Sequence, residues 1–73
     1  MTREEFLAEL DELVELPQGT LKGPEKLKEL IEWNSLALLG FVGLVDSHNG
    51  LKLEPRQIAS CITVDDLLNL AKV

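Results

Sequence analysis

The longest uncharged stretch of the chain lies at its centre. Residues 36–45 contain no charged or strongly polar side chain, and the polar residues 46–50 that follow end on a glycine. An apolar run closed in this way is typical of a helix with Gly50 at its C-cap. Asn34 is among the best N-cap residues, which leaves Ser35 at the first helical position. The pattern therefore predicts a central helix that begins at Ser35.

The N-terminal segment has the pattern of an amphipathic helix. Thr2 and Glu5 fit a capping box, in which each side chain accepts from a backbone N–H that the helix start leaves unpaired. The apolar positions share one side and the acids the other: Phe6, Leu7, Leu10, Leu13 and Val14 against Glu9, Asp11, Glu12 and Glu15. We expect the apolar stripe to enter the core and the acids to form a solvated face rather than a dedicated docking site. Pro17 should end the helix at about Leu16.

The C-terminal third predicts two further helices. Pro55 suits the first position of a helix of a turn or two around residues 56–60. Thr63 and Asp66 repeat the capping box. The apolar positions behind that box keep helical spacing: Val64, Leu67, Leu68 and Ala71. Residues 51–53 alternate like a strand, but a lone strand has no partner in this sequence, so we expect a loop with both of its leucines tucked in.

The central helix is apolar on nearly all sides, so it either lies within the core or offers part of its surface to a partner. The inward positions that we expect are Leu39, Val42 and Val45, widened by Leu38 and Phe41. Leu36 and Leu44 remain as exposed contacts. Gly40 and Gly43 each cost roughly 1 kcal/mol against alanine in a helix. Close approach of another backbone should compensate, which is a simpler explanation than a groove for an acyl chain.

Size and charge narrow the classes of function. The chain has 73 residues, so we expect one domain, into which a catalytic cleft is hard to fit. Thirteen acids against seven bases give a net charge of −6, which repels nucleic acid and attracts basic protein surfaces. No apolar stretch is long enough to span a bilayer, and the first residues lack the pattern of a signal peptide. We therefore expect a cytoplasmic protein that binds neither nucleic acid nor membrane.

The sequence offers little for metal or catalytic chemistry. Cys61 is the only cysteine, which excludes an internal disulfide and a cysteine-rich metal site. His48 has no cluster of cysteines or acids placed to form a metal site or a catalytic triad with it. With no general base or metal ligand predicted beside Ser35, we do not expect an enzyme. Trp33, close to this serine, could be a docking aromatic or a lid over the edge of the core, and we favour the lid.

The setting of Ser35 favours a phosphate, because unpaired N–H groups and the positive end of the helix dipole both attract an anion. The segment Trp33-Asn34-Ser35-Leu36 resembles the attachment motif of acyl carrier proteins and peptidyl carrier domains. In that family Asp-Ser-Leu opens the second helix, and the serine bears 4′-phosphopantetheine. The resemblance covers essentially the whole chain, through an acidic first helix, a loop like residues 16–21, Leu27 and Leu30 before the motif, and a stretch like residues 58–67.

This resemblance implies an all-α, acyl-carrier-protein-like four-helix bundle, with three main helices and one short helix, in a single carrier domain over residues 1–73. It also implies a long, mostly irregular loop between the first two helices, packed through Leu21, Leu27 and Leu30. Propensity alone favours a short helix over residues 24–31, because proline is permitted at a first helical position. We expect the compromise, which is a crossing loop that contains a turn or two of helix.

By the same resemblance, a phosphopantetheinyl transferase attaches the arm to Ser35, and the thiol of the arm holds acyl or aminoacyl groups as thioesters. The partners implied are the acyl-loading and acyl-transferring enzymes of fatty acid, polyketide or related biosynthesis. The protein itself is then a monomeric carrier and not an enzyme. Asn34, Leu36, Leu44 and Asp46 are the partner contacts that we expect. The acyl group and the pathway stay open.

One residue departs from the family pattern. Asn34 stands where the family has aspartate, which keeps the capping oxygen and loses the charge. The resemblance implies that this aspartate helps the transferase and its magnesium to engage the carrier. An alternative prediction is therefore a protein with the carrier fold that is not phosphopantetheinylated and acts as an interaction module.

Overall fold

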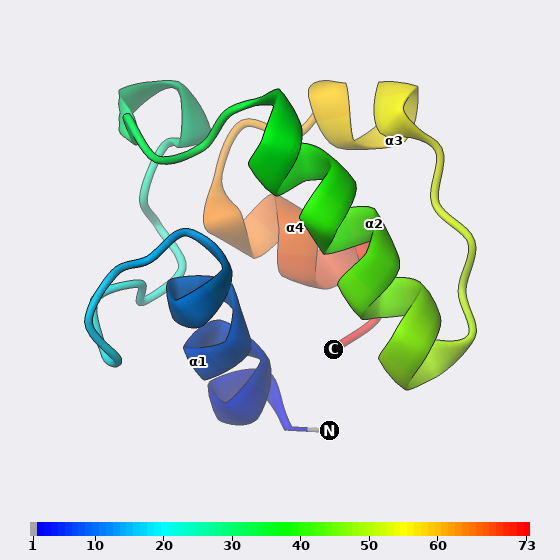
Figure 1. Ribbon diagram of the computed structural model, residues 1–73, viewed down its shortest axis with the longest axis horizontal. Helices are drawn as coiled ribbons and strands as arrows, with labels where there is room; N and C mark the ends of the chain where they lie inside the picture. The colour runs from blue at the N-terminus through cyan, green and yellow to red at the C-terminus, as the bar shows by residue number, and fades with distance from the viewer. Residues whose placement is uncertain (1) are drawn as a thin grey trace.

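A computed structural model describes residues 2–73, which form a small all-α domain (Figure 1). Its elements are α1 (Arg3–Leu13), a 3₁₀ turn η1 (Leu27–Glu29), α2 (Ser35–Asn49), α3 (Pro55–Ala59) and α4 (Val64–Leu70). No β-strand occurs within residues 2–73, where the backbone forms a single antiparallel bridge between Lys26 and Thr63. The expectation of an all-α domain with four helices, one of them short, is confirmed.

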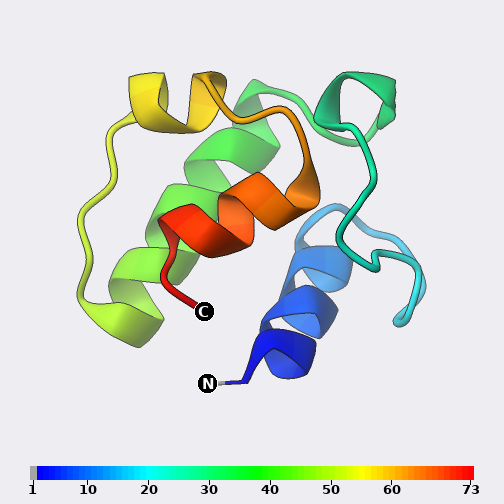
Figure 2. The same ribbon diagram turned by 180° about the vertical axis from the view of Figure 1, so that it is seen from behind.

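The longest helix, α2, lies at the centre of the arrangement. Figures 1 and 2 show α4 against one face of α2, α1 beside the pair, and α3 near the N-terminal end of α2. The core is made of apolar side chains from all four helices and from the connecting segments: Phe6, Leu10, Val14, Leu21, Leu27, Ala37, Phe41, Val45, Leu53, Ile58, Val64, Leu67, Leu68 and Ala71. Among residues 2–73, none of the helices combines the length and the apolar character needed to cross a membrane.

The predicted helix caps are confirmed. The Thr2 hydroxyl accepts from the Glu5 N–H at 3.1 Å, and the Glu5 carboxylate accepts from the Thr2 N–H at 2.9 Å. Thr63 and Asp66 repeat this exchange at the start of α4. The backbone bond from Thr2 lowers the pKa of the Glu5 carboxyl, and bonds from Ile62 and Thr63 lower that of Asp66. Because these pKa values are lower in the folded state, both carboxylates stabilise the fold at pH values above the ordinary carboxyl pKa. This stabilisation is lost as the pH falls through the lowered pKa values.

Helix α1 ends earlier than the sequence suggested. We expected Pro17 to stop it at about Leu16, but its last residue is Leu13. The chain then turns at Glu15, whose φ of 60° is left-handed. The Leu16 N–H bonds the Asp11 carbonyl at 2.8 Å, and the Glu15 N–H bonds the Glu12 carbonyl at 3.1 Å. These two bonds form a Schellman motif, so the end of the helix is set by its own carbonyls and not by the proline.

Asp11 corrects the prediction of a fully solvated acidic face on α1. Glu12 and Glu15 are exposed, but Asp11 has no exposed surface. Its carboxylate accepts from the Gly19 N–H at 2.9 Å and from the Leu21 N–H at 3.0 Å. A buried carboxylate needs such partners to offset its desolvation. Asp11 therefore ties the loop that follows α1 back onto that helix.

The connection between α1 and α2 is long and mostly irregular, as expected. Of the segment for which propensity favoured a helix, only the 3₁₀ turn forms. Leu21 and Leu27 are buried and Leu30 is half-buried, which confirms the predicted packing of this loop. Backbone bonds hold it to the segment before α4, including Leu27 N–H to Ile62 carbonyl at 2.9 Å. In the loop before α3, Leu53 is buried and Leu51 half-buried, which confirms the second predicted loop.

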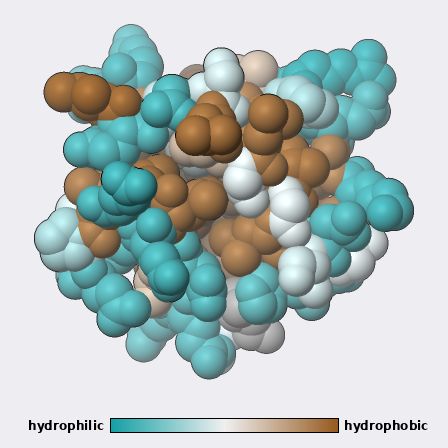
Figure 3. All heavy atoms as spheres, in the orientation of Figure 1, coloured by the Kyte–Doolittle hydropathy of each residue, from teal (hydrophilic) through white to brown (hydrophobic). Residues whose placement is uncertain are grey.

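The inward face of α2 differs in part from the prediction. The side chains of α2 that enter the core are Ala37, Phe41 and Val45. Of the expected line, only Val45 is buried, whereas Leu39 is 59% exposed and Val42 is half-buried. The apolar side chains that remain outside gather on the face of the molecule over α2 (Figure 3). An uninterrupted apolar run has no polar side from which to read the orientation of the helix, so the neighbouring helices decide it.

The two glycines of α2 have different surroundings. A Cβ placed on Gly40 would lie 2.5 Å from Cδ1 of Leu13, so the glycine makes room for a side chain of α1. A Cβ placed on Gly43 would have no neighbour within 4 Å. The expected approach of another backbone is therefore wrong at both positions. Gly40 is explained by the packing of Leu13, and nothing in the structure explains Gly43.

Candidate functional site

The N-terminus of α2 forms as the sequence predicted. Asn34 is the N-cap, with extended backbone angles, and its Oδ1 accepts from the Ala37 N–H at 3.0 Å. The first bond along the helix runs from the Leu38 N–H to the Asn34 carbonyl at 2.9 Å. Ser35 is therefore the first residue of a 15-residue helix, and its side chain is exposed.

This position suits a phosphate attached to the Ser35 hydroxyl. The N–H groups of Ser35 and Leu36 precede the first intrahelical bonds, so helix geometry gives them no carbonyl partner within α2. They point out of the helix start, where the helix dipole is positive. An anion on Ser35 would thus be stabilised by backbone groups of this chain without any charged side chain.

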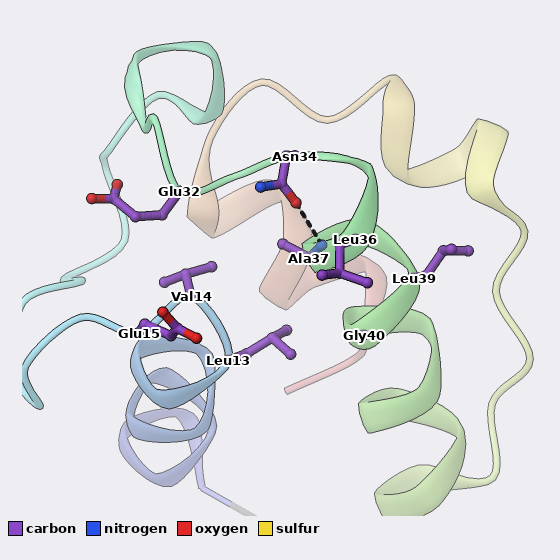
Figure 4. Close-up of a pocket in the computed structure, with 9 residues that line it drawn as sticks. All are labelled: Leu13, Val14, Glu15, Glu32, Asn34, Leu36, Ala37, Leu39 and Gly40. Atoms are coloured by element: carbon purple, nitrogen blue, oxygen red, sulfur yellow. Dashed lines mark hydrogen bonds between the residues drawn. The ribbon is translucent and has the colours of Figure 1, made fainter.

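A hollow of about 670 Å³ lies beside Ser35, between the end of α1 and the start of α2. Figure 4 shows its lining, which consists of Leu13, Val14, Glu15, Glu32, Asn34, Leu36, Ala37, Leu39 and Gly40. Both sequence neighbours of Ser35 belong to this lining. The floor of the hollow is apolar. The carboxylate of Glu15 stands on the side toward α1, and that of Glu32 on the side toward the loop before α2. Sequence reasoning did not connect these two acids with the site. Glu15 comes from the separate segment after α1, whereas Glu32 stands only three residues before Ser35 and could have been found from its position.

Trp33 fixes the backbone that leads into the site. Its ring is half-buried and lies edge-on to Phe41, with the ring centroids 6.2 Å apart. Phe41 in turn packs edge-on against Phe6 of α1 at 5.9 Å. This stack supports the interpretation of Trp33 as a lid over the edge of the core, and it holds the chain directly before Asn34.

The predicted partner residues fall into two groups. Asn34 and the 79% exposed Leu36 flank Ser35. Leu44 and Asp46 lie further along α2, and Asp46, eleven residues from Ser35, is about 17 Å away along the helix axis. Leu44 is half-buried, so it is less open to a partner than we expected. Asp46 is exposed and lies 3.5 Å from the Lys52 ammonium.

The remaining reactive side chains lie apart from Ser35. Cys61 is a half-buried free thiol in the segment between α3 and α4. Its pKa is raised, mainly by burial and to a lesser degree by the negative charge of the nearby Asp66 carboxylate. His48 is exposed in the last turn of α2, at the opposite end from Ser35. Within residues 2–73, no group of three or more histidine, cysteine, aspartate or glutamate side chains is placed to hold a metal ion.

Comparison of the chain with protein-family models, with curated proteins and with solved structures gives no match.

Proposed function

We propose that this protein is an acyl carrier protein whose Ser35 bears 4′-phosphopantetheine, and that its four helices form an acyl-carrier-like bundle. One observation carries the proposal. Ser35 is an exposed hydroxyl at the first position of a long, capped helix, inside a sequence that resembles the carrier attachment motif. The order of the helices and the long loop before α2 agree with the same resemblance.

The residues at this helix start fit such an arm. Oγ of Ser35 offers the point of attachment, and the N–H groups of Ser35 and Leu36 would hold the phosphodiester oxygens. Asn34 keeps the first turn formed, and Leu36 offers an apolar contact to the enzymes that act on the arm. When bound, the group supplies a thiol that carries acyl or aminoacyl chains as thioesters. The protein does no chemistry of its own, and its role is to present a tethered substrate at high local concentration.

The partners of this carrier are a phosphopantetheinyl transferase, which modifies Ser35 from coenzyme A, and the enzymes that load and transfer acyl groups in fatty acid, polyketide or related biosynthesis. In this proposal the protein works as a monomer in the cytoplasm. Its net charge of −6 favours enzymes with basic docking surfaces.

A second candidate function rests on Asn34. This residue caps α2 without carrying the negative charge of the aspartate in the carrier motif. If the transferase depends on that charge, the protein is a carrier-like fold that stays unmodified and acts as an interaction module.

Incubation with coenzyme A and a broad-specificity phosphopantetheinyl transferase should add one phosphopantetheinyl group, measured by intact mass spectrometry. Ser35→Ala should abolish the added mass. Ser47→Ala is the matched control and should be modified like the wild type, because Ser47 is an exposed serine near the other end of the same helix. Added mass on Ser35→Ala would refute the assignment, and failure of several transferases on the wild type would favour the unmodified module.

Asn34→Asp separates the capping role of this residue from its missing charge. Aspartate and asparagine cap helices about equally, so the free energy of unfolding of the unmodified protein should change by only about 0.3 kcal/mol. The modification rate should rise several-fold, up to about tenfold, since a contact worth about 1.4 kcal/mol changes a rate by that factor. Initial rates of modification and urea unfolding curves measure the two effects.

Asn34→Ala is the control for the cap, because it should lower the free energy of unfolding by about 1 kcal/mol. Equal modification rates for the wild type and the Asn34→Asp variant across several transferases would show that the missing charge is immaterial and would leave Asn34 as a helix cap alone.

A further inference from the structure

A second hollow continues the first along the seam between α1 and α2. It has a volume of about 500 Å³ and is lined by Glu9, Glu12, Leu13, Gly40, Leu44 and Ser47. Leu13 and Gly40 line both hollows. The two hollows therefore adjoin where Leu13 packs against Gly40. Together they are here named the α1–α2 groove, which runs from the start of α2 past its middle.

The α2 side of this groove carries no charged side chain and is mostly apolar. The chain carries no charge between Glu32 and Asp46. Leu36 is 79% exposed and Leu39 is 59% exposed, and both line the first hollow, the one beside Ser35. Figure 3 shows apolar side chains gathered on the face of the molecule over α2. Burial of exposed leucines at about 25 cal/mol per Å² is a driving force for association.

The α1 side of the groove is acidic. Glu9, Glu12 and Glu15 line it from α1 and the turn that follows, and Glu32 joins them from the loop before α2. No lysine, arginine or histidine lines either hollow. Within residues 2–73 the ion pairs involve other acids, namely Asp65, Asp46 and Glu54. Among residues 2–73, the groove thus presents leucines beside carboxylates that form no ion pair.

We propose that the α1–α2 groove is a docking surface for an amphipathic helix of a partner protein, with apolar residues on one face and lysine or arginine along its edge. The apolar face would cover Leu36 and Leu39, and the cations would meet the carboxylates of α1 and Glu32. Such complementarity raises association rates and selects the partner. A second copy of this chain would bring more negative charge to the same acids, and an anionic membrane surface would be repelled by them.

Binding at the α1–α2 groove does not require the modification of Ser35. The acids of the groove come from α1 and the loop, and no atom of Ser35 lines it. The inference therefore does not rest on phosphopantetheinylation, and the unmodified protein should bind. The groove reaches Asn34 and Leu36, so a helix docked there would lie next to the hydroxyl without covering the residue itself.

The test uses the full, unmodified chain and a synthetic helical peptide with a leucine face flanked by lysines. A scrambled peptide of equal composition and a version with glutamate in place of lysine are the reference probes. We expect the first peptide to bind tightest by fluorescence anisotropy, and the NMR signals of the Leu13, Gly40 and Leu44 amides to shift most. Ser35→Ala should bind with the same Kd, which separates this result from the proposed function.

Two matched pairs of variants locate the contact. Leu39→Ser should weaken binding by about fivefold, as expected for one partly exposed leucine. Ile62→Ser should not, because Ile62 is 63% exposed but lies outside the groove. Glu12→Lys should weaken binding about fivefold, and Glu29→Lys, with the same change of charge at an exposed site outside the groove, by less than twofold.

Equal binding of the scrambled peptide, or unchanged binding by Leu39→Ser, would overturn the proposal. Two other occupants are tested with the same variant. Self-association in sedimentation equilibrium that Leu39→Ser abolishes would assign the groove to a second copy, and binding to neutral or anionic phospholipid vesicles that the same variant abolishes would assign it to a membrane. Either result would also overturn the proposal.

Discussion

Asp11→Ala should lower the free energy of unfolding by about 3 kcal/mol. The substitution removes the acceptors of the Gly19 and Leu21 N–H groups, which are partly or fully buried. Loss of hydrogen bonds to a charged group costs about 1.5–3 kcal/mol each, and some of that loss is recovered when water reaches the Gly19 N–H. A domain of this size has a total stability of roughly 4–11 kcal/mol. Asp11→Ala should therefore remove a large part of the free energy of unfolding of the protein.

Urea unfolding followed by circular dichroism measures this effect. Glu12→Ala is the matched control, since Glu12 is the next residue of α1 and is exposed. It should change the free energy of unfolding by no more than about 0.5 kcal/mol. Amide hydrogen exchange should also quicken at Gly19 and Leu21 in the Asp11→Ala variant. A loss below about 1 kcal/mol, less than a single hydrogen bond to a charged group contributes, would contradict the role of this carboxylate as the anchor of the loop.

Phe41→Ala should lower the free energy of unfolding by about 4 kcal/mol, within the range for aromatic residues in protein cores. Phe41 is fully buried and packs edge-on against both Phe6 and Trp33. The cavity left behind would lie between α1, α2 and the segment that carries Trp33. Trp33 should then become more exposed, and its fluorescence should shift to longer wavelength.

Urea unfolding and the emission spectrum of the single tryptophan measure both effects. Val42→Ala provides the comparison, because Val42 is the half-buried neighbour of Phe41. It should cost less than half as much and leave the tryptophan emission unchanged. An unaltered emission spectrum in the folded fraction of Phe41→Ala would contradict the view that Phe41 supports Trp33 and, through it, the entry to the Ser35 site.

The apolar residues of α2 lie in three different surroundings: the core, the contact with Leu13, and the exposed surface. Ala37, Phe41 and Val45 face the core, Gly40 admits the Leu13 side chain, and Leu36 and Leu39 remain outside. A helix that is apolar on nearly all sides is typical of a buried element. Here it instead combines a core face with an exposed apolar strip.

Local sequence is enough to predict where most helices begin and what caps them. Thr2, Asn34 and Thr63 accept the bonds predicted for them, and Gly50 takes the left-handed conformation at the end of α2. These features depend on residues within four positions of one another, so the chain specifies them locally. The position of Ser35, on which the proposed function depends, belongs to this class. The packing of Leu21 and Leu27 in the connecting loop was expected from the family resemblance and not from local pattern.

Packing between helices, in contrast, sets which side of α2 faces inward and what surrounds its exposed side. Phe41 is inward as expected, but the apolar run had no polar face to orient it, so the packing of the neighbouring helices placed Ala37 in the core instead of Leu39. The burial of Asp11 likewise depends on N–H groups eight and ten residues away along the chain. The α1–α2 groove joins the carboxylates of Glu9, Glu12 and Glu15 to leucines of α2 that are more than twenty residues further along the chain. Such contacts arise from packing between distant segments, which periodicity along one segment does not encode.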